Sequence, residues 1–149
     1  TATYHDKRNE WSFQMSYLTV YLATFIVFLL IDFVGLSFVL KPLFARDIGP
    51  LMLDGFRVLP AFAFYAFLVF VVMWFVGWPA LDSGKSLLWV FGSAALIGAA
   101  AYGTFEFTNY AILKDWTPTL VYTDLTWGTM LTGASAAAGV AITRAAGLG

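Results

Sequence analysis

Three carboxyl side chains lie within the long apolar segments of this sequence: Asp32, Glu106 and Asp124. Insertion of a carboxyl group at the centre of a membrane-spanning helix costs about 2.5–3.5 kcal/mol of free energy. Such residues are therefore rare in spans unless they have a function. In an apolar medium these groups bind and release protons or hold a polar headgroup. The sequence therefore predicts a proton-linked or headgroup-binding site. The alternative interpretation is that the three groups hydrogen-bond between helices and specify the bundle.

Further polar side chains share helical faces with these carboxyls. Tyr102 lies four residues before Glu106 and Asn109 three residues after it, so all three are expected on one face. Trp127 lies three residues after Asp124 and shares its face in the same way. The predicted intramembrane polar cluster consists of Asp32, Tyr102, Glu106, Asn109, Asp124 and Trp127.

Four apolar segments are available to position this cluster, each long enough for the roughly 20 residues that a spanning helix needs. The first is expected to end at Lys41-Pro42 and the second at Pro79, because proline interrupts a helix. The expected spans are 15–40, 58–78, 86–113 and 119–143, with a polar tail at 1–14, a bundle over 15–143 and a short tail at 144–149. Short connections predict an all-α integral membrane protein folded as an antiparallel four-transmembrane-helix bundle.

The antiparallel order predicts the depth of the carboxyls. Asp32, Glu106 and Asp124 would lie in the same leaflet, about 8–12 Å from one interface by helix rise. Arg57 begins the second segment on that side, so it is a candidate counter-ion for the cluster. Lysine and arginine are equally numerous on the two sides, and the positive-inside rule therefore gives no orientation.

Small residues recur at four-residue spacing in the third and fourth segments. Such rows let helix backbones approach closely in lipid. The sequence favours packing of these two segments within one chain, and a dimer interface is the alternative. The predicted packing residues are Ala95, Ala99, Gly103, Thr129, Gly133 and Ala137.

The second segment carries large aromatic residues on all sides of its helix. Lipid is the default neighbour of such a surface. Phe67, Phe70 and Trp74 are the candidate contact surface for a partner protein or a flat apolar cofactor. No cofactor is predicted, although a bound lipid, quinone or pigment is compatible with this surface.

The composition excludes several classes of protein. Of 149 residues, 60% are hydrophobic and 11% are charged, whereas a soluble domain averages about 25% charged residues. A net charge of −1 gives no basic face for nucleic acid. Cysteine is absent and the single histidine, His5, lies in the polar tail, so no metal site is predicted. An integral membrane protein in contact with lipid is the class that remains.

The chain resembles a bacterial family of small four-span membrane proteins, the domain of unknown function numbered 2177. The resemblance rests on five sequence pieces: YLTVYL from Tyr17, LID from Leu30, AYGTFEFTN from Ala101, LKDW from Leu113 and DLTWGT from Asp124. Members of this family often have aspartate where Glu106 stands and usually start near Met15. The resemblance implies the four-helix fold and an acidic cluster, and it implies no activity.

Two classes of function follow as expectations. The first is a non-enzymatic accessory subunit packed against other subunits of a larger membrane complex, such as a photosynthetic or respiratory assembly in a bacterial inner membrane. The second is a small transporter or membrane enzyme that acts on a lipid or amphiphile through the intramembrane carboxyls. The sequence leans away from an enzyme, because no nucleophile motif is present. The second class requires a cavity that joins the carboxyls.

Overall fold

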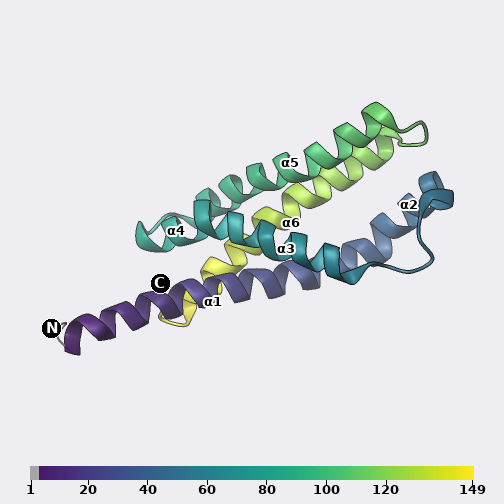
Figure 1. Ribbon diagram of the computed structural model, residues 1–149. Helices are drawn as coiled ribbons and strands as arrows, with labels where there is room; N and C mark the ends of the chain where they lie inside the picture. Colours follow the sequence, from purple (N-terminus) through teal and green to yellow (C-terminus); the bar gives the residue numbers. More distant parts are fainter. Residues whose placement is uncertain (1–3) are drawn as a thin grey trace.

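The computed structural model describes residues 4–149, with side chains from Trp11 onward, and this part of the chain is helical with short connections. Figure 1 shows the long helices running alternately in opposite directions, with the two termini at the same end. Four helical stretches have the length and composition to cross a membrane, which confirms the predicted fold class. Their bounds are Trp11–Leu51, Val58–Asp82, Leu87–Ile112 and Pro118–Ala145.

Shorter elements make up these spans. The first span contains α1 (Tyr4–Gly35), the π-helix η1 (Leu36–Leu40), α2 (Lys41–Ile48) and the 3-10 helix η2 (Gly49–Leu51). The second contains α3 (Val58–Val72), the π-helix η3 (Met73–Gly77) and α4 (Trp78–Asp82). The third is α5 (Leu87–Ile112) and the fourth is α6 (Pro118–Ala145). Because α1 begins at Tyr4, residues 4–14 of the predicted polar tail form the first turns of this helix.

Both helices that were expected to end near a proline continue past it. One residue, Lys41, separates Pro42 from the end of η1. One residue, Trp78, likewise separates Pro79 from the end of η3. A proline has no N–H to donate, and its ring clashes with the carbonyl four residues earlier, here those of Phe38 and Phe75. Both carbonyls belong to a π-helical segment, where the wider turn makes room for the ring. The helix therefore continues past each proline.

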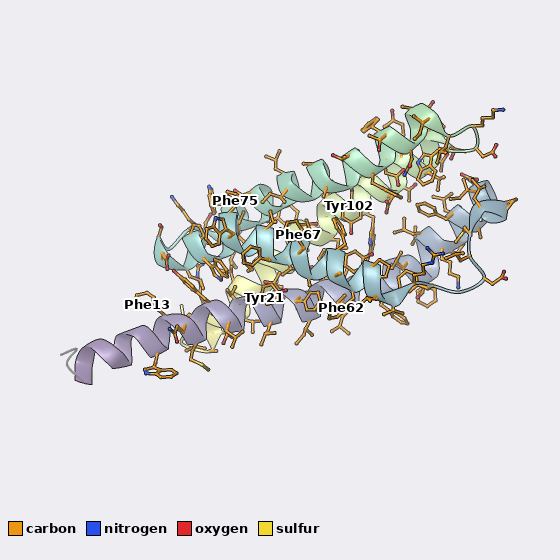
Figure 2. All side chains as sticks on the ribbon, in the orientation of Figure 1. Phe13, Tyr21, Phe62, Phe67, Phe75 and Tyr102 are labelled. Carbon is orange, nitrogen blue, oxygen red and sulfur yellow. The ribbon has the colours of Figure 1, made fainter. Side chains whose placement is uncertain are left out.

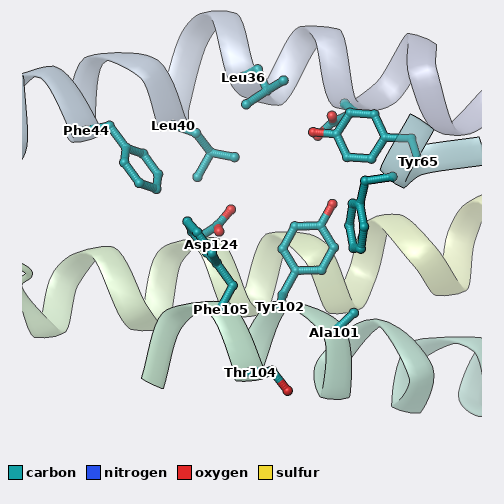
Figure 3. A pocket seen from close by; sticks show the side chains of 11 residues that line it. Leu36, Leu40, Phe44, Tyr65, Ala101, Tyr102, Thr104, Phe105 and Asp124 are labelled. Atoms are coloured by element: carbon teal, nitrogen blue, oxygen red, sulfur yellow. The ribbon is translucent and has the colours of Figure 1, made fainter. Parts of the chain in front are cut away.

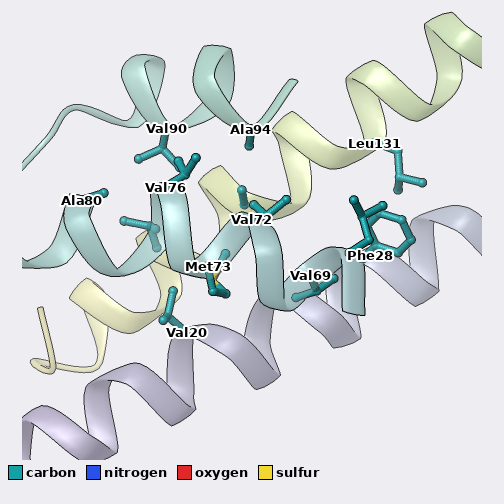
Figure 4. Close-up of a cluster of buried hydrophobic side chains, with 13 residues drawn as sticks. Val20, Phe28, Val69, Val72, Met73, Val76, Ala80, Val90, Ala94 and Leu131 are labelled. Atoms are coloured by element: carbon teal, nitrogen blue, oxygen red, sulfur yellow. The ribbon is translucent and has the colours of Figure 1, made fainter. Parts of the chain in front are cut away.

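The main hydrophobic core lies where α1, the α3–η3 helix, α5 and α6 meet. Figure 4 shows Val20 of α1 close to Met73 of η3, and Phe28 of α1 close to Val69 of α3 and Leu131 of α6. All five side chains are buried. Other aromatic side chains lie on the outside of the helices and are exposed, such as Phe62, Phe67 and Phe75 in Figure 2.

The α5–α6 pair is the most extensive helix contact in the described chain, as the small residues predicted. A side chain at Gly133 would meet the backbone carbonyl of Phe91 at 2.9 Å. The closest approach to a backbone atom of the partner helix, however, is at Gly98, which the predicted row of small residues omitted. A methyl group there would lie 2.6 Å from Thr132 Oγ1 and 2.8 Å from the Gly128 carbonyl oxygen. Of the predicted row, Ala95, Gly103 and Gly133 are buried, and Ala99, Thr129 and Ala137 are half-buried.

A second, smaller apolar cluster fixes α2 against the start of α6. It contains Ile48, Trp116, Leu120 and Val121, with Phe44 packed edge-on against Trp116 at 5.5 Å between ring centroids. Thr117 Oγ1 also donates a hydrogen bond of 2.6 Å to Asp47. These contacts hold the end of the first span over the polar cluster.

Candidate functional site

A pocket of about 470 Å³ lies among the helices at the depth of the predicted carboxyls. Every span contributes to its lining. The polar lining residues are Asp32 of α1, Tyr65 of α3, Tyr102 and Thr104 of α5, and Asp124 of α6. The apolar walls are Leu36, Leu40, Phe44, Phe64, Ala101 and Phe105. Figure 3 shows Tyr102 and Asp124 pointing from α5 and α6 towards Leu36, Leu40 and Tyr65 across the pocket. The pocket therefore combines an apolar enclosure with carboxyl and phenol groups.

Asp32 is held in place by two aromatic side chains. Its side chain is 2% exposed, and its Oδ1 accepts a hydrogen bond of 3.3 Å from Trp127 Nε1. The Tyr65 hydroxyl interacts with the same carboxyl from α3. Gly35 leaves room for the Trp127 ring to reach Asp32, because any side chain at position 35 would overlap the indole. The glycine, the indole and the carboxyl thus form one unit between α1 and α6.

Asp124 and Glu106 form the other half of the polar cluster. Asp124 is 6% exposed, and its carboxyl is close enough to interact electrostatically with Glu106 and with Asp32. Glu106 is fully buried, and its Oε2 accepts a hydrogen bond of 2.7 Å from Trp116 Nε1. The second oxygen of Glu106, Oε1, is buried without a hydrogen-bond partner. The structure therefore brings the three predicted carboxyls together from three different helices.

Tyr102 places a further polar group in the pocket. Its ring lies against α6 at Gly128, where a side chain would overlap it. The hydroxyl is buried and has no hydrogen-bond partner. In Figure 3 this hydroxyl points into the space between Asp124 and Tyr65. A group that donates to or accepts from Tyr102 can thus be bound in the pocket without displacing another partner.

Two predicted members of the site lie apart from the pocket. Asn109 is half-buried near the end of α5 and does not line the pocket. Arg57 is exposed just before α3. Within residues 11–149 the salt bridge that the structure contains joins Arg46 to Asp47, so Arg57 forms no ion pair with the carboxyls there. The pocket accordingly has no basic side chain in its lining.

The aromatic residues proposed as a contact surface lie outside the pocket. Phe67, Phe70 and Trp74 are 63%, 42% and 57% exposed in the isolated chain. Phe70 and Trp74 both pack against Trp78, which stacks on Tyr17 of α1. They form a continuous exposed aromatic strip along the second span.

Sequence reasoning missed several residues of the site, above all Tyr65. It is the one hydroxyl-bearing residue in the otherwise apolar helix α3, and this isolated polarity was the available signal. Phe44, Phe64 and Phe105 gave no comparable signal, because phenylalanine is frequent throughout the spans. In the same described part of the chain, no group of three or more His, Cys, Asp or Glu residues has an arrangement that could hold a metal ion.

Comparison with known proteins gave one family match. A family described as predicted membrane protein (DUF2177) matches this chain over residues 17–141. This range covers most of the first and fourth spans, the whole of the second and third, and every pocket residue. Comparisons with curated proteins and with solved structures gave no match.

Proposed function

The chain belongs to this family of predicted membrane proteins, DUF2177, and we propose that it is a small transporter for a membrane-embedded amphiphile. The amphiphile would occupy the pocket, with its polar group at the carboxyls and its apolar part along the aromatic and aliphatic walls. We also propose that the membrane is the inner membrane of a bacterium.

The observation that carries this proposal is the pocket that joins Asp32 to Asp124. Both carboxyls are buried, yet both line the same cavity of about 470 Å³. That volume lies within the range of ligand sites, about 300–1,000 Å³, and an apolar lining with a few convergent polar groups is their usual composition. Groups that served only to join helices would be expected to fill the space between them, so the cavity favours a binding role.

The rim of the pocket supports entry from the side. Phe64 on α3 and Phe105 on α5 are each 48% exposed although they line the pocket, and Thr104 beside Phe105 is exposed as well. Phe64 is six residues after the start of α3, which places the opening about 9 Å along the helix and within the apolar band. An amphiphile could therefore enter from the lipid between α3 and α5 without crossing the aqueous surface.

The polar groups of the pocket favour binding and proton exchange. Asp32 and Asp124 can each exchange a proton, and the phenols of Tyr65 and Tyr102 can hydrogen-bond in either direction. Proton exchange at a buried carboxyl is the usual way in which transport of a ligand is linked to a proton gradient. A membrane enzyme that acts on the same amphiphile would need a further reactive group at this site.

Filling the pocket tests the proposal. Ala101→Phe places a ring in the cavity and is expected to weaken amphiphile binding roughly ten- to hundredfold, from an overpacking cost of about 1–3 kcal/mol. Ala100→Phe, on the exposed side of the same helix, is the matched control. Mass spectrometry of amphiphiles that co-purify with the full chain in mild detergent measures the difference. Equal retention by both variants, or none by the wild type, contradicts the proposal.

The exposed aromatic strip supports an accessory subunit as a second candidate function. Phe67, Phe70 and Trp74 would then face a neighbouring subunit. Extraction of native membranes in mild detergent, followed by sizing and mass spectrometry, tests this candidate. A subunit is expected to migrate with a large, defined assembly, and migration as a lone four-helix bundle would remove the candidate.

A further inference from the structure

Resting on the proposed function, we propose that the amphiphile carries a cationic headgroup, such as an ammonium. The feature that points to this class is the position of two buried carboxyls, Asp32 and Asp124, in a pocket walled largely by aromatic rings. Three independent features favour a cation: the charge of the lining, the aromatic walls and the unpartnered polar atoms.

The charge of the lining favours a cation. Asp32 and Asp124 both face the pocket, Glu106 lies directly behind Asp124, and no basic side chain lines the cavity. A buried carboxylate without a compensating charge is costly, whereas one that contacts a cation is stabilised by it. An anionic headgroup would be repelled by these carboxylates. A cationic headgroup would supply the positive charge that Arg57, which forms no ion pair with them among the residues that the structure describes, does not provide.

The walls supply a second kind of cation contact. The rings that line the pocket belong to Phe44, Phe64, Tyr65, Tyr102 and Phe105. Aromatic faces attract cations, and cages of such rings recognise quaternary ammonium groups. Two of these rings are fixed in place, since Phe44 and Phe105 each pack edge-on against Trp116 with centroids 5.5 Å apart. Two rings of the pocket wall are therefore held in position before a ligand binds.

The unpartnered polar atoms indicate that the polar cluster is incomplete without a ligand. Glu106 is fully buried beside Asp124, with which it interacts directly, and its Oε1 accepts no hydrogen bond from an amide, indole or hydroxyl group of the described chain. The Tyr102 hydroxyl also lacks a partner and points into the cavity. Buried polar groups are normally satisfied, so each such atom calls for a partner. An ammonium N–H that donates to the Tyr102 oxygen from within the pocket would supply the partner that this hydroxyl lacks.

The test compares probes of different charge on the full chain purified in detergent. Radiolabelled tetraphenylphosphonium is the cationic probe, tetraphenylborate has the same shape with a negative charge, and monoolein is a neutral amphiphile. We expect saturable tetraphenylphosphonium binding that Asp32→Asn and Asp124→Asn each weaken at least tenfold, because a desolvated charge contact is lost. Asp115→Asn changes an exposed carboxyl in the α5–α6 connection and is expected to leave binding unchanged.

An aromatic variant keeps the test decisive if a carboxyl variant fails to fold. Phe64→Leu removes a ring from the wall and is expected to weaken tetraphenylphosphonium binding about two- to tenfold while monoolein binding is unchanged. Phe75→Leu, at an exposed ring of the same span that does not line the pocket, is its control. Saturable monoolein binding without a preference for the cation overturns the charge assignment and leaves the amphiphile transporter standing. Binding of none of the three probes overturns both proposals.

Discussion

Gly98→Ala is expected to destabilise the protein by about 1–3 kcal/mol, although alanine is the better helix former. The added methyl group would lie 2.6 Å from Thr132 Oγ1, 2.7 Å from Thr132 Cβ and 2.8 Å from the Gly128 carbonyl oxygen. Thr132 cannot turn aside without cost, because its hydroxyl donates a hydrogen bond of 2.6 Å to that same carbonyl. The expected result is therefore a separation of α5 from α6.

Gly92→Ala on the same helix is the matched control for this prediction. No atom lies within 4 Å of a methyl group at position 92, so the substitution is expected to stabilise the helix by about 0.5–1 kcal/mol. The two variants should shift the midpoint of thermal unfolding in opposite directions when both are measured in one detergent. If Gly98→Ala unfolds at or above the wild-type temperature, the close crossing of α5 and α6 at this position is incorrect.

The position of Gly98 illustrates which parts of the packing the sequence could predict. Rows of small residues predicted that α5 and α6 pack together, because their spacing follows the helical repeat. They could not identify Gly98 as the point of closest backbone approach, since a small residue at every fourth position defines a face and leaves the crossing point along that face undetermined. The crossing point depends on how the helices tilt, and the neighbouring α1 and α3 influence that tilt.

The candidate site was predictable to a similar degree. Asp32, Glu106 and Asp124 stand out because each is costly in an apolar segment, and the antiparallel order of the spans brings them to one depth. The partners of these carboxyls were harder to predict. Trp116 lies in the α5–α6 connection, and its indole reaches back to Glu106 over ten positions in the chain. Such a contact depends on the path of the connection, which hydrophobic patterning does not specify.

Arg57 was predicted as a counter-ion for the carboxyls, and the structure does not place it among them. Its position at the start of the second span made it the one basic residue expected near the carboxyls. The structure leaves it exposed before α3, where the long side chain can stay in contact with water. Removal of an arginine from water is costly, and the exposed connection before α3 offers it a hydrated position. Sequence proximity to a cluster therefore does not determine whether a charge enters it.

Trp116→Phe is expected to destabilise the protein by about 2–3 kcal/mol through a single hydrogen bond. The indole Nε1 donates to Glu106 Oε2 at 2.7 Å, and the other oxygen of this fully buried carboxyl already lacks a partner. Phenylalanine keeps a ring for Phe44 and Phe105 to pack against and removes the N–H. Glu106 would then be buried with no hydrogen-bond partner on either oxygen. Trp11→Phe, at a side chain that is 67% exposed, is expected to change stability by less than about 0.5 kcal/mol.

A double-mutant cycle separates the lost hydrogen bond from the lost indole volume. Glu106→Leu alone leaves the Trp116 N–H unpaired and is expected to cost about 1–3 kcal/mol. Combined with Trp116→Phe it removes both polar partners, so the double variant should be more stable than Trp116→Phe alone by about 1–2 kcal/mol. Thermal unfolding of the four proteins in one detergent gives the coupling. Strictly additive losses would show that Trp116 acts through packing alone, and the carboxyl cluster would then be anchored by the helices rather than by the α5–α6 connection.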